Sequence, residues 1–175
     1  MTTRGATSGP SSLAGMIVAE LKKCHITHVV WLAHSEAGPV YDIALADPEL
    51  TLVPVCREGE AVAVAAGLWM GGKNPVVLHQ STGLYDAGDS IRGLALDLRL
   101  PLLLLIGYRG WRPEPPFTDS AATFLEPILD AWGIKHYLLD SPEGAGKVSM
   151  AYQEAQEMSR PVAVLIVREG ERRDR

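Results

Sequence analysis

The stretch Val55-Cys56-Arg57-Glu58-Gly59-Glu60 stands between a short β-rich run and a long segment of small apolar residues. The run before it, residues 52–55, reads Leu-Val-Pro-Val, and residues 58–70 after it are mostly Ala, Val and Gly. This order predicts a strand followed by a buried helix whose first turn carries Glu58. Because ligands bind at the carboxyl ends of strands in open α/β sheets, Glu58 is the first candidate for a functional carboxylate.

Strand-like and helix-like segments alternate six times along the chain. The predicted strands are residues 28–32, 51–55, 75–79, 101–106, 135–139 and 161–167. The predicted helices are residues 11–23, with Ser11 or Ser12 as the N-cap, 35–46, 58–70, 84–98, 120–132 and 143–159. This alternation predicts an α/β fold with three layers, α/β/α, in which helices cover both faces of a six-stranded parallel sheet.

The length of 175 residues suffices for one domain with a full core, and we place that domain at residues 11–168. Residues 1–10 are rich in Thr, Ser and Gly and are predicted to be disordered, and residues 169–175 form a charged tail. We find no internal repeat and no linker that would divide the chain further.

Composition favours a globular cytoplasmic protein, with 47% hydrophobic and 21% charged residues. The net charge of −5 does not suggest nucleic-acid binding, and no apolar run has the length of a membrane span. The polar N-terminus does not resemble a signal peptide. Cys24 and Cys56 lack metal-type or redox-type spacing, so both are predicted to be buried thiols in a reducing compartment.

Polar side chains follow four of the predicted strands, and in a parallel sheet these strand ends meet at one edge. The four groups are His34-Ser35, Arg57-Glu58, His79-Gln80-Ser81-Thr82 and Tyr108-Arg109. Since loops are commonly polar, their joint placement argues for a site more strongly than any single residue does. The Gly/Pro-rich loop at residues 107–116 is also of a length that is often functional.

Several other motifs are weak. Gly144-Ala145-Gly146-Lys147 resembles the end of a phosphate loop, but Val148 stands where Ser or Thr is needed. His25 and His28 straddle a predicted helix end and strand, which disfavours a shared metal. Gly88-Asp89-Ser90 lies within a predicted helix, and Glu60 is expected to complement the helix dipole.

Residues 57–67, Arg-Glu-Gly-Glu-Ala-Val-Ala-Val-Ala-Ala-Gly, resemble the glutamate-plus-small-helix signature of thiamine diphosphate enzymes, in their pyrimidine-binding domain. Glu58 and Gly67 keep the nine-residue spacing of that signature. The resemblance continues through residues 72–75, 79–84 and 99–106 and covers roughly residues 12–168. In order and length the chain looks most like the α subunit of sulfopyruvate decarboxylase and its relative phosphonopyruvate decarboxylase.

This resemblance implies a thiamine diphosphate-binding fold, which is flavodoxin-like, and a decarboxylase that acts on a 2-oxo acid. Glu58 would be catalytic, with its carboxyl group hydrogen-bonded to ring nitrogen N1′ of the cofactor. Further residues are implied in two sets: Gln80, Thr82 and Gly83 at the cofactor's pyrimidine, and His34, Ser35 and His79 at the substrate. The implied cofactors are thiamine diphosphate and Mg²⁺.

The chain lacks the Gly-Asp-Gly motif, followed at a distance by Asn, that holds Mg²⁺ and the diphosphate in this family. The resemblance therefore implies half of an active site. A separate diphosphate-binding β subunit would carry that motif and hold the metal, giving a hetero-oligomer. The apolar residues Leu68, Trp69 and Met70 are candidates for the subunit interface.

Two segments depart from the family pattern and leave the substrate open: the loop His34-Ser35-Glu36 after the first predicted strand and the run after the third. Close relatives usually show Asn-Ser-Gly-Leu-Gly-Asn where this chain has Ser-Thr-Gly-Leu-Tyr-Asp at residues 81–86. A carboligase or lyase half of the same superfamily is one alternative function. A non-catalytic flavodoxin-like regulatory domain is another, although a phosphorelay receiver would need acidic residues where Ala33-His34 and His79-Gln80 stand.

Overall fold

The computed structural model of the protein describes residues 9–34 and 38–167. All neighbouring strands pair in parallel, in the order β2-β1-β3-β4-β6-β5. The strands are β1 (His28–Trp31), β2 (Thr51–Pro54), β3 (Pro75–Gln80), β4 (Leu103–Gly107), β5 (Lys135–Leu139) and β6 (Val162–Ile166). The predicted six-stranded parallel sheet is therefore confirmed, whereas Ser35 and most of the two predicted terminal segments lie outside the described residues.

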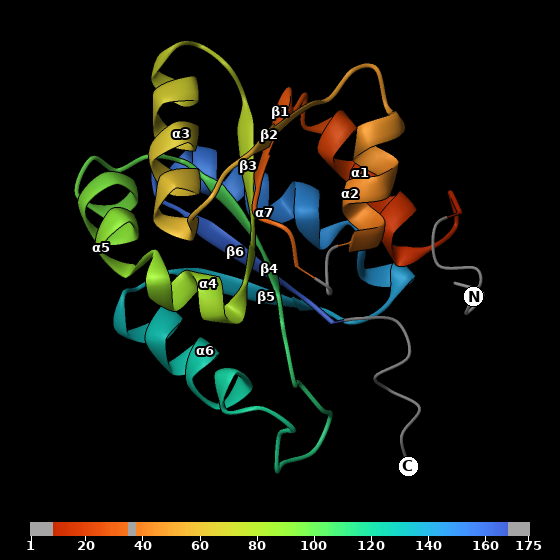
Figure 1. The fold of residues 1–175 in the computed structure, drawn as a ribbon, viewed down its shortest axis with the longest axis vertical. Coiled ribbons are helices and arrows are strands. Elements are labelled where there is room, and N and C mark those ends of the chain that lie inside the picture. Colours follow the sequence, from red (N-terminus) through yellow and green to blue (C-terminus); the bar gives the residue numbers. More distant parts are fainter. Residues whose placement is uncertain (1–8, 35–37, 168–175) are drawn as a thin grey trace.

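Helices cover both faces of the sheet (Figure 1). One face carries α1 (Leu13–Lys23), α2 (Gly38–Ala46) and α7 (Lys147–Met158), and the other carries α3 (Glu58–Met70), α6 (Ser120–Ala131) and the helical segment between β3 and β4. Because side chains alternate along a strand, Val76 and Leu78 of β3 face the first core and Val77 faces the second. Burial on both faces explains why β3 and β4 read as continuous aliphatic runs.

Two helix starts agree with the sequence. The hydroxyl of Ser12 accepts a hydrogen bond from the backbone N–H of Gly15 at 3.1 Å and so caps α1. The helix α3 begins at Glu58 and ends at Met70, as its small apolar residues predict. Within the described parts of the chain, none of the helices is long and apolar enough to cross a membrane.

The segment between β3 and β4 differs from its prediction as a single helix over residues 84–98. Helix begins at Ser81, directly after the strand, as α4 (Ser81–Asp86), and continues through α5 (Gly88–Ser90) into a π-helical turn, η1 (Ile91–Leu96). The predicted loop at residues 80–83 is therefore wrong, because Gln80 serves as the N-cap and the chain turns without a linker. In the same way, the predicted helix 143–159 is a 3₁₀ turn (Pro142–Gly144) followed by α7.

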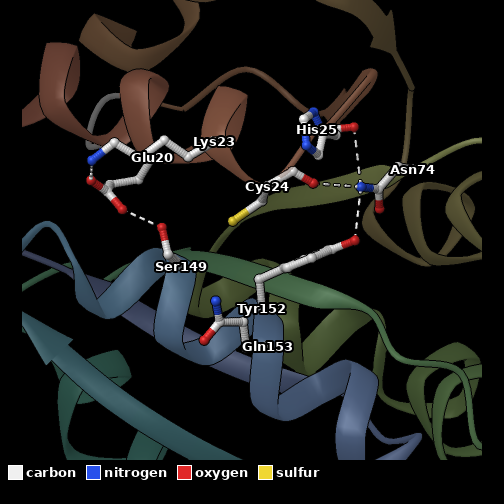
Figure 2. Close-up of a pocket in the computed structure, with 8 residues that line it drawn as sticks. All are labelled: Glu20, Lys23, Cys24, His25, Asn74, Ser149, Tyr152 and Gln153. Carbon is white, nitrogen blue, oxygen red and sulfur yellow. Dashed lines mark hydrogen bonds and ion pairs between the residues drawn. The ribbon is translucent and has the colours of Figure 1, made fainter.

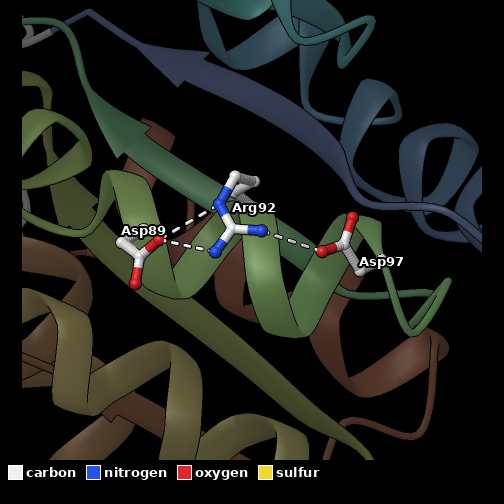
Figure 3. A network of polar contacts seen from close by, with 3 residues as sticks. All are labelled: Asp89, Arg92 and Asp97. Carbon is white, nitrogen blue, oxygen red and sulfur yellow. Dashed lines mark hydrogen bonds and ion pairs between the residues drawn. The ribbon is translucent and has the colours of Figure 1, made fainter.

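The guanidinium of Arg92 spans the π-helical turn (Figure 3). It donates to Asp89 at 2.7 and 3.0 Å and to Asp97 at 2.9 Å. All three side chains are exposed, so this network contributes little to stability. Asp89 is thus the partner of an arginine in this helical segment.

The order of the strands defines where a ligand can bind. The chain runs from β1 outward to β2 and then crosses back over β1 to β3, with α2 and α3 on opposite faces of the sheet. Connections that leave in opposite directions open a crevice at the carboxyl ends of the two central strands. In this fold that switch point lies at the ends of β1 and β3.

Candidate active site

Polar side chains from four strand ends lie at the carboxyl edge of the sheet. His34 follows β1, Glu58 follows β2, and His79 is the penultimate residue of β3, directly before Gln80. Tyr108 follows β4, and the pairing of Gln80 with Gly107 sets these strand ends at the same level. The topology thus gathers the residues that the sequence singled out, apart from Ser35, which lies outside the described residues.

The side chain of Glu58 lies against the α-carbon of Gly83. A β-carbon added at Gly83 would stand 2.5 Å from Cγ and 2.8 Å from Oε1 of Glu58, closer than real side chains approach. Glu58 is half-buried, and among the described residues its carboxylate has no hydrogen-bond or ion-pair partner. The first turn of α3 and the first turn of α4 therefore hold a carboxyl group that is available to a ligand.

Glu60, the other carboxylate in this turn, has a different role. Its Oε2 accepts a hydrogen bond from the backbone N–H of Cys56 at 2.9 Å and closes the first turn of α3 from outside. The expectation that Glu60 stabilises the helix start is consistent with this contact. Of the two carboxylates in the first turn of α3, only that of Glu60 is used to stabilise the start of the helix.

His79 is 2% exposed, and neither of its ring nitrogens has a hydrogen-bond partner among the described residues. Burial, more than the nearby His34 ring, lowers the pKa of His79 to about 4, and a contact with the backbone of Gly83, which falls short of hydrogen-bond geometry, offsets part of this shift. His79 is therefore neutral near pH 7. A buried imidazole without partners is costly, which marks a position where a polar ligand would restore the lost hydrogen bonds.

Ser81 joins this group, although the sequence analysis named it only within the polar run after β3 and gave it no role of its own. Its side chain is fully buried, and its hydroxyl has no partner among the described residues. The neighbouring Thr82 is exposed and donates its hydroxyl proton to Oε1 of Gln80 at 2.8 Å. The only sequence signal for Ser81 was its position directly after a strand, which is shared by many structural serines.

A comparison with known proteins bears on what this arrangement does. No protein-family model matches the chain. The α subunit of sulfopyruvate decarboxylase from Methanocaldococcus jannaschii is 31% identical over 121 residues, a match that covers 68% of this chain and 72% of that subunit. The chain belongs to the sulfopyruvate decarboxylase α-subunit family of thiamine diphosphate-dependent decarboxylases.

Longer members of this group contain the same unit as one part. Phosphonopyruvate decarboxylase from Streptomyces viridochromogenes is 32% identical over 97 residues, covering 55% of this chain but only 24% of that enzyme. Benzoylformate decarboxylase from Polynucleobacter necessarius shares the fold, with a TM-score of 0.70 at 22% identity over 89% of this chain and 29% of its own. The sulfopyruvate decarboxylase α-subunit fold thus corresponds to less than a third of these larger chains.

The arginines at the same edge of this sulfopyruvate decarboxylase-type subunit are ion-paired. Nε of Arg109 lies 2.9 Å from Oδ2 of Asp119, which also caps α6 by accepting from the N–H of Ala121. Arg57 lies 3.4 Å from Asp86, and both side chains are substantially exposed. Arg109, which the sequence placed in a polar group at this edge, is thus ion-paired within the loop that carries it.

A pocket of about 490 Å³ lies at the opposite, amino edge of the sheet, between α1 and α7 (Figure 2). The amide of Asn74 donates to the carbonyls of Cys24 and His25 and to the hydroxyl of Tyr152 at 2.8 to 3.1 Å. The carboxylate of Glu20 accepts hydrogen bonds from the side chains of Lys23 and Ser149. These contacts fix the turn that enters β1, so the polar groups of this pocket serve the fold.

The remaining sequence motifs resolve into structural roles. Lys147 of the phosphate-loop-like run donates to the carbonyl of Leu138 at 2.7 Å. In residues 9–34 and 38–167 no three His, Cys, Asp or Glu side chains gather as a metal site would require. Cys24 is buried, but Cys56 is exposed, so the prediction of two buried thiols is wrong for Cys56, which follows the edge strand β2.

The buried His79 predicts a pH-dependent stability. The pKa of His79 in the folded protein is about 4, below the ordinary 6.5. Between pH 4 and pH 6.5 the imidazole is therefore protonated in the unfolded chain but not in the folded chain. Lowering the pH through this window should therefore remove up to about 3 kcal/mol of folding free energy through His79 alone. Urea unfolding at several pH values should show that the free energy of unfolding falls less steeply with decreasing pH in His79→Gln than in wild type.

The exposed His25 offers the matched control for this experiment. The variant His25→Gln should keep the steep loss of stability on acidification. If the free energy of unfolding depended on pH equally in wild type and in His79→Gln, the result would contradict the burial of an unprotonated imidazole at this position.

Proposed function

We propose that the chain is the pyrimidine-binding α subunit of a thiamine diphosphate-dependent 2-oxo acid decarboxylase that requires a separate diphosphate-binding subunit. The observation that carries the proposal is the carboxyl group of Glu58, which has no partner among the described residues and is set against Gly83 at the switch point of the sheet. Membership of the family of sulfopyruvate decarboxylase α subunits supports the reaction class.

The residues at this edge fit the pyrimidine ring of the cofactor. Glu58 offers a carboxyl group to a ring nitrogen, and Gly83 leaves that group undisturbed because it has no side chain. Within residues 9–34 and 38–167, the buried polar atoms of His79 and Ser81 have no hydrogen-bond partner, so a polar ligand would satisfy them. Gln80 and Thr82, joined to each other, would line the same pocket.

When bound, thiamine diphosphate would supply the electron sink that decarboxylation of a 2-oxo acid requires. The task of Glu58 is to hold a hydrogen bond to the ring nitrogen N1′ and so favour the reactive tautomer of the ring. A positioned acid–base group of this kind contributes about 10²–10⁴-fold in rate. Mg²⁺ and the diphosphate would be held by the partner subunit.

His34, Ser35 and His79 are proposed to contact the substrate. Neutral His79 can donate from one ring nitrogen and accept at the other, so it can orient the polar groups of a 2-oxo acid without bringing a positive charge. The nearby ring of His34 contributes to the lowered pKa of His79, which supports a shared role for the two side chains.

Two observations support a partner subunit. The matched region covers 72% of an α subunit but only 24% of phosphonopyruvate decarboxylase. The rest of that longer enzyme is long enough to hold the diphosphate-binding half of the active site within the same chain. In addition, α3 lacks a segregated polar face, yet Ala63 and Gly67 are exposed and Trp69 and Met70 are 37% and 71% exposed. A helix that is apolar on all sides is normally covered, so we propose that the partner packs along α3, the helix that begins at Glu58 and ends at Met70.

The proposed activity is tested by co-expressing the chain with a chain of the same genome that carries a Gly-Asp-Gly motif, here called the Gly-Asp-Gly chain, and measuring carbon dioxide release from 2-oxo acids. The panel includes sulfopyruvate, phosphonopyruvate, pyruvate and benzoylformate. Release that needs both chains, thiamine diphosphate and Mg²⁺ is the expected result. Carboligation without carbon dioxide release would favour the lyase alternative, and complete inactivity would favour a non-catalytic domain. A cytoplasmic location and the lack of nucleic-acid and membrane partners remain predictions.

A further inference from the structure

Residues 108–119, here called the finger, connect β4 to α6 and extend beyond the rest of the fold at the carboxyl edge (Figure 1). The base of the finger is closed by backbone contact between its two arms. The N–H of Thr118 donates to the carbonyl of Gly110 at 3.0 Å, and Arg109 is ion-paired with Asp119. Gly110 has a φ of +78°, and a β-carbon there would lie 2.4 Å from Cβ of Asp119, so only glycine allows the arms to approach this closely.

Aromatic packing anchors the finger to the body of the protein. The rings of Trp111 and Phe117 lie 6.4 and 6.5 Å from the ring of Tyr108, one from each arm. Tyr108 is 1% exposed, and its hydroxyl donates to Oε1 of Glu126 on α6 at 2.7 Å. The base of the finger is therefore a small core of its own, fixed to the helix that follows.

The tip of the finger, residues 112–116, reads Arg-Pro-Glu-Pro-Pro and is exposed throughout. Three proline rings restrict the backbone of this tip, because proline fixes φ. A segment that is already ordered loses little conformational entropy when it binds. Exposed apolar rings on a preformed projection have the character of a recognition element, and proline rings pack preferentially against aromatic side chains.

We propose that the finger docks on the diphosphate-binding partner subunit, with its proline rings against an apolar, aromatic-lined surface of that subunit. This inference rests on the proposed function. Under that function the partner must cover the carboxyl edge to bring the diphosphate half of the cofactor to Glu58. The finger rises from the same edge, two strands away from β1, so a partner seated over the site meets its tip.

Contact and affinity are measured separately. A photocrosslinking amino acid in place of Glu114 should form a covalent product with the Gly-Asp-Gly chain in the co-expressed complex. In analytical ultracentrifugation, the variant Pro113→Ala/Pro115→Ala/Pro116→Ala should bind that chain at least about tenfold more weakly than wild type. The matched control is Pro48→Ala, an exposed proline between α2 and β2 at the other edge of the sheet.

The outcomes distinguish a failure of the docking role of the finger from a failure of the proposed function. Crosslinking together with weakened binding, at an unchanged Tm of the isolated chain, supports the docking role. Wild-type affinity in the triple variant would overturn that role and leave the two-subunit enzyme intact. A crosslink to a second copy of this chain would overturn it in favour of self-association, and a wild-type chain that never binds the Gly-Asp-Gly chain would overturn the proposed function itself.

Discussion

Replacing Glu58 with glutamine is expected to abolish turnover of the two-subunit enzyme while leaving its folding and assembly intact. The amide keeps the size of the side chain but cannot serve as the acid–base partner of the pyrimidine nitrogen. The expected loss in kcat is about 10²–10⁴-fold, the usual contribution of such a group. Steady-state carbon dioxide release measures the loss, and circular dichroism and sedimentation verify that the complex still forms.

The neighbouring Glu60 supplies the matched control. Glu60→Gln alters a carboxylate in the same turn that accepts from the N–H of Cys56 and does not face Gly83. It should reduce stability by about 0.5–1 kcal/mol at most and leave kcat near the wild-type value. Near-normal activity in Glu58→Gln, or equal losses in both variants, would contradict the assignment of Glu58 as the catalytic carboxylate.

Gly83→Ala is expected to lower activity strongly, because the new methyl group takes the space of the Glu58 side chain. The contact with Cγ, at 2.5 Å, cannot be relieved by moving the carboxyl group alone, so the whole side chain must change its rotamer. A displacement of about 1 Å at a reacting group can cost about 10²-fold in rate. We expect a comparable fall in kcat, measured by the same carbon dioxide assay.

Gly93→Ala is the control for Gly83→Ala, since a β-carbon at Gly93 meets nothing within 4 Å. It should leave activity unchanged. A double-mutant cycle isolates the contact itself: any stability cost of Gly83→Ala should shrink in a Glu58→Ala background, with a coupling energy of about 0.5–3 kcal/mol. Wild-type kcat in Gly83→Ala would show that Glu58 does not act from the position seen here.

The sequence specified the elements well where local signals agree. The helix α3 has the predicted bounds because a strand, two first-turn carboxylates and a run of small residues all mark the same start, and the following Gly71-Gly72 marks its end. The strand β4 is evident from its aliphatic run. The strand order, in contrast, depends on which distant strands pair, and no local signal encodes it.

The segment after β3 shows where local signals mislead. Gln80, Ser81, Thr82 and Gly83 favour turns and caps, so they predict a loop, whereas tertiary packing draws Ser81 and Gly83 into the first turn of α4. The close approach of Gly83 to Glu58 joins residues 25 positions apart and could not be read from either motif. The burial of Ser81 could not be predicted for the same reason, since it arises only from the neighbours that the fold supplies.

The half-site is tested most directly by calorimetric titration of thiamine diphosphate with Mg²⁺ into this chain alone and into its mixture with the Gly-Asp-Gly chain. We predict saturable binding in the mixture and none with this chain alone, because Glu58 contacts only the pyrimidine end of the cofactor. Tight binding to this chain alone would contradict the division of the site between two subunits. No binding in either titration would contradict the assignment of a thiamine diphosphate site to this fold.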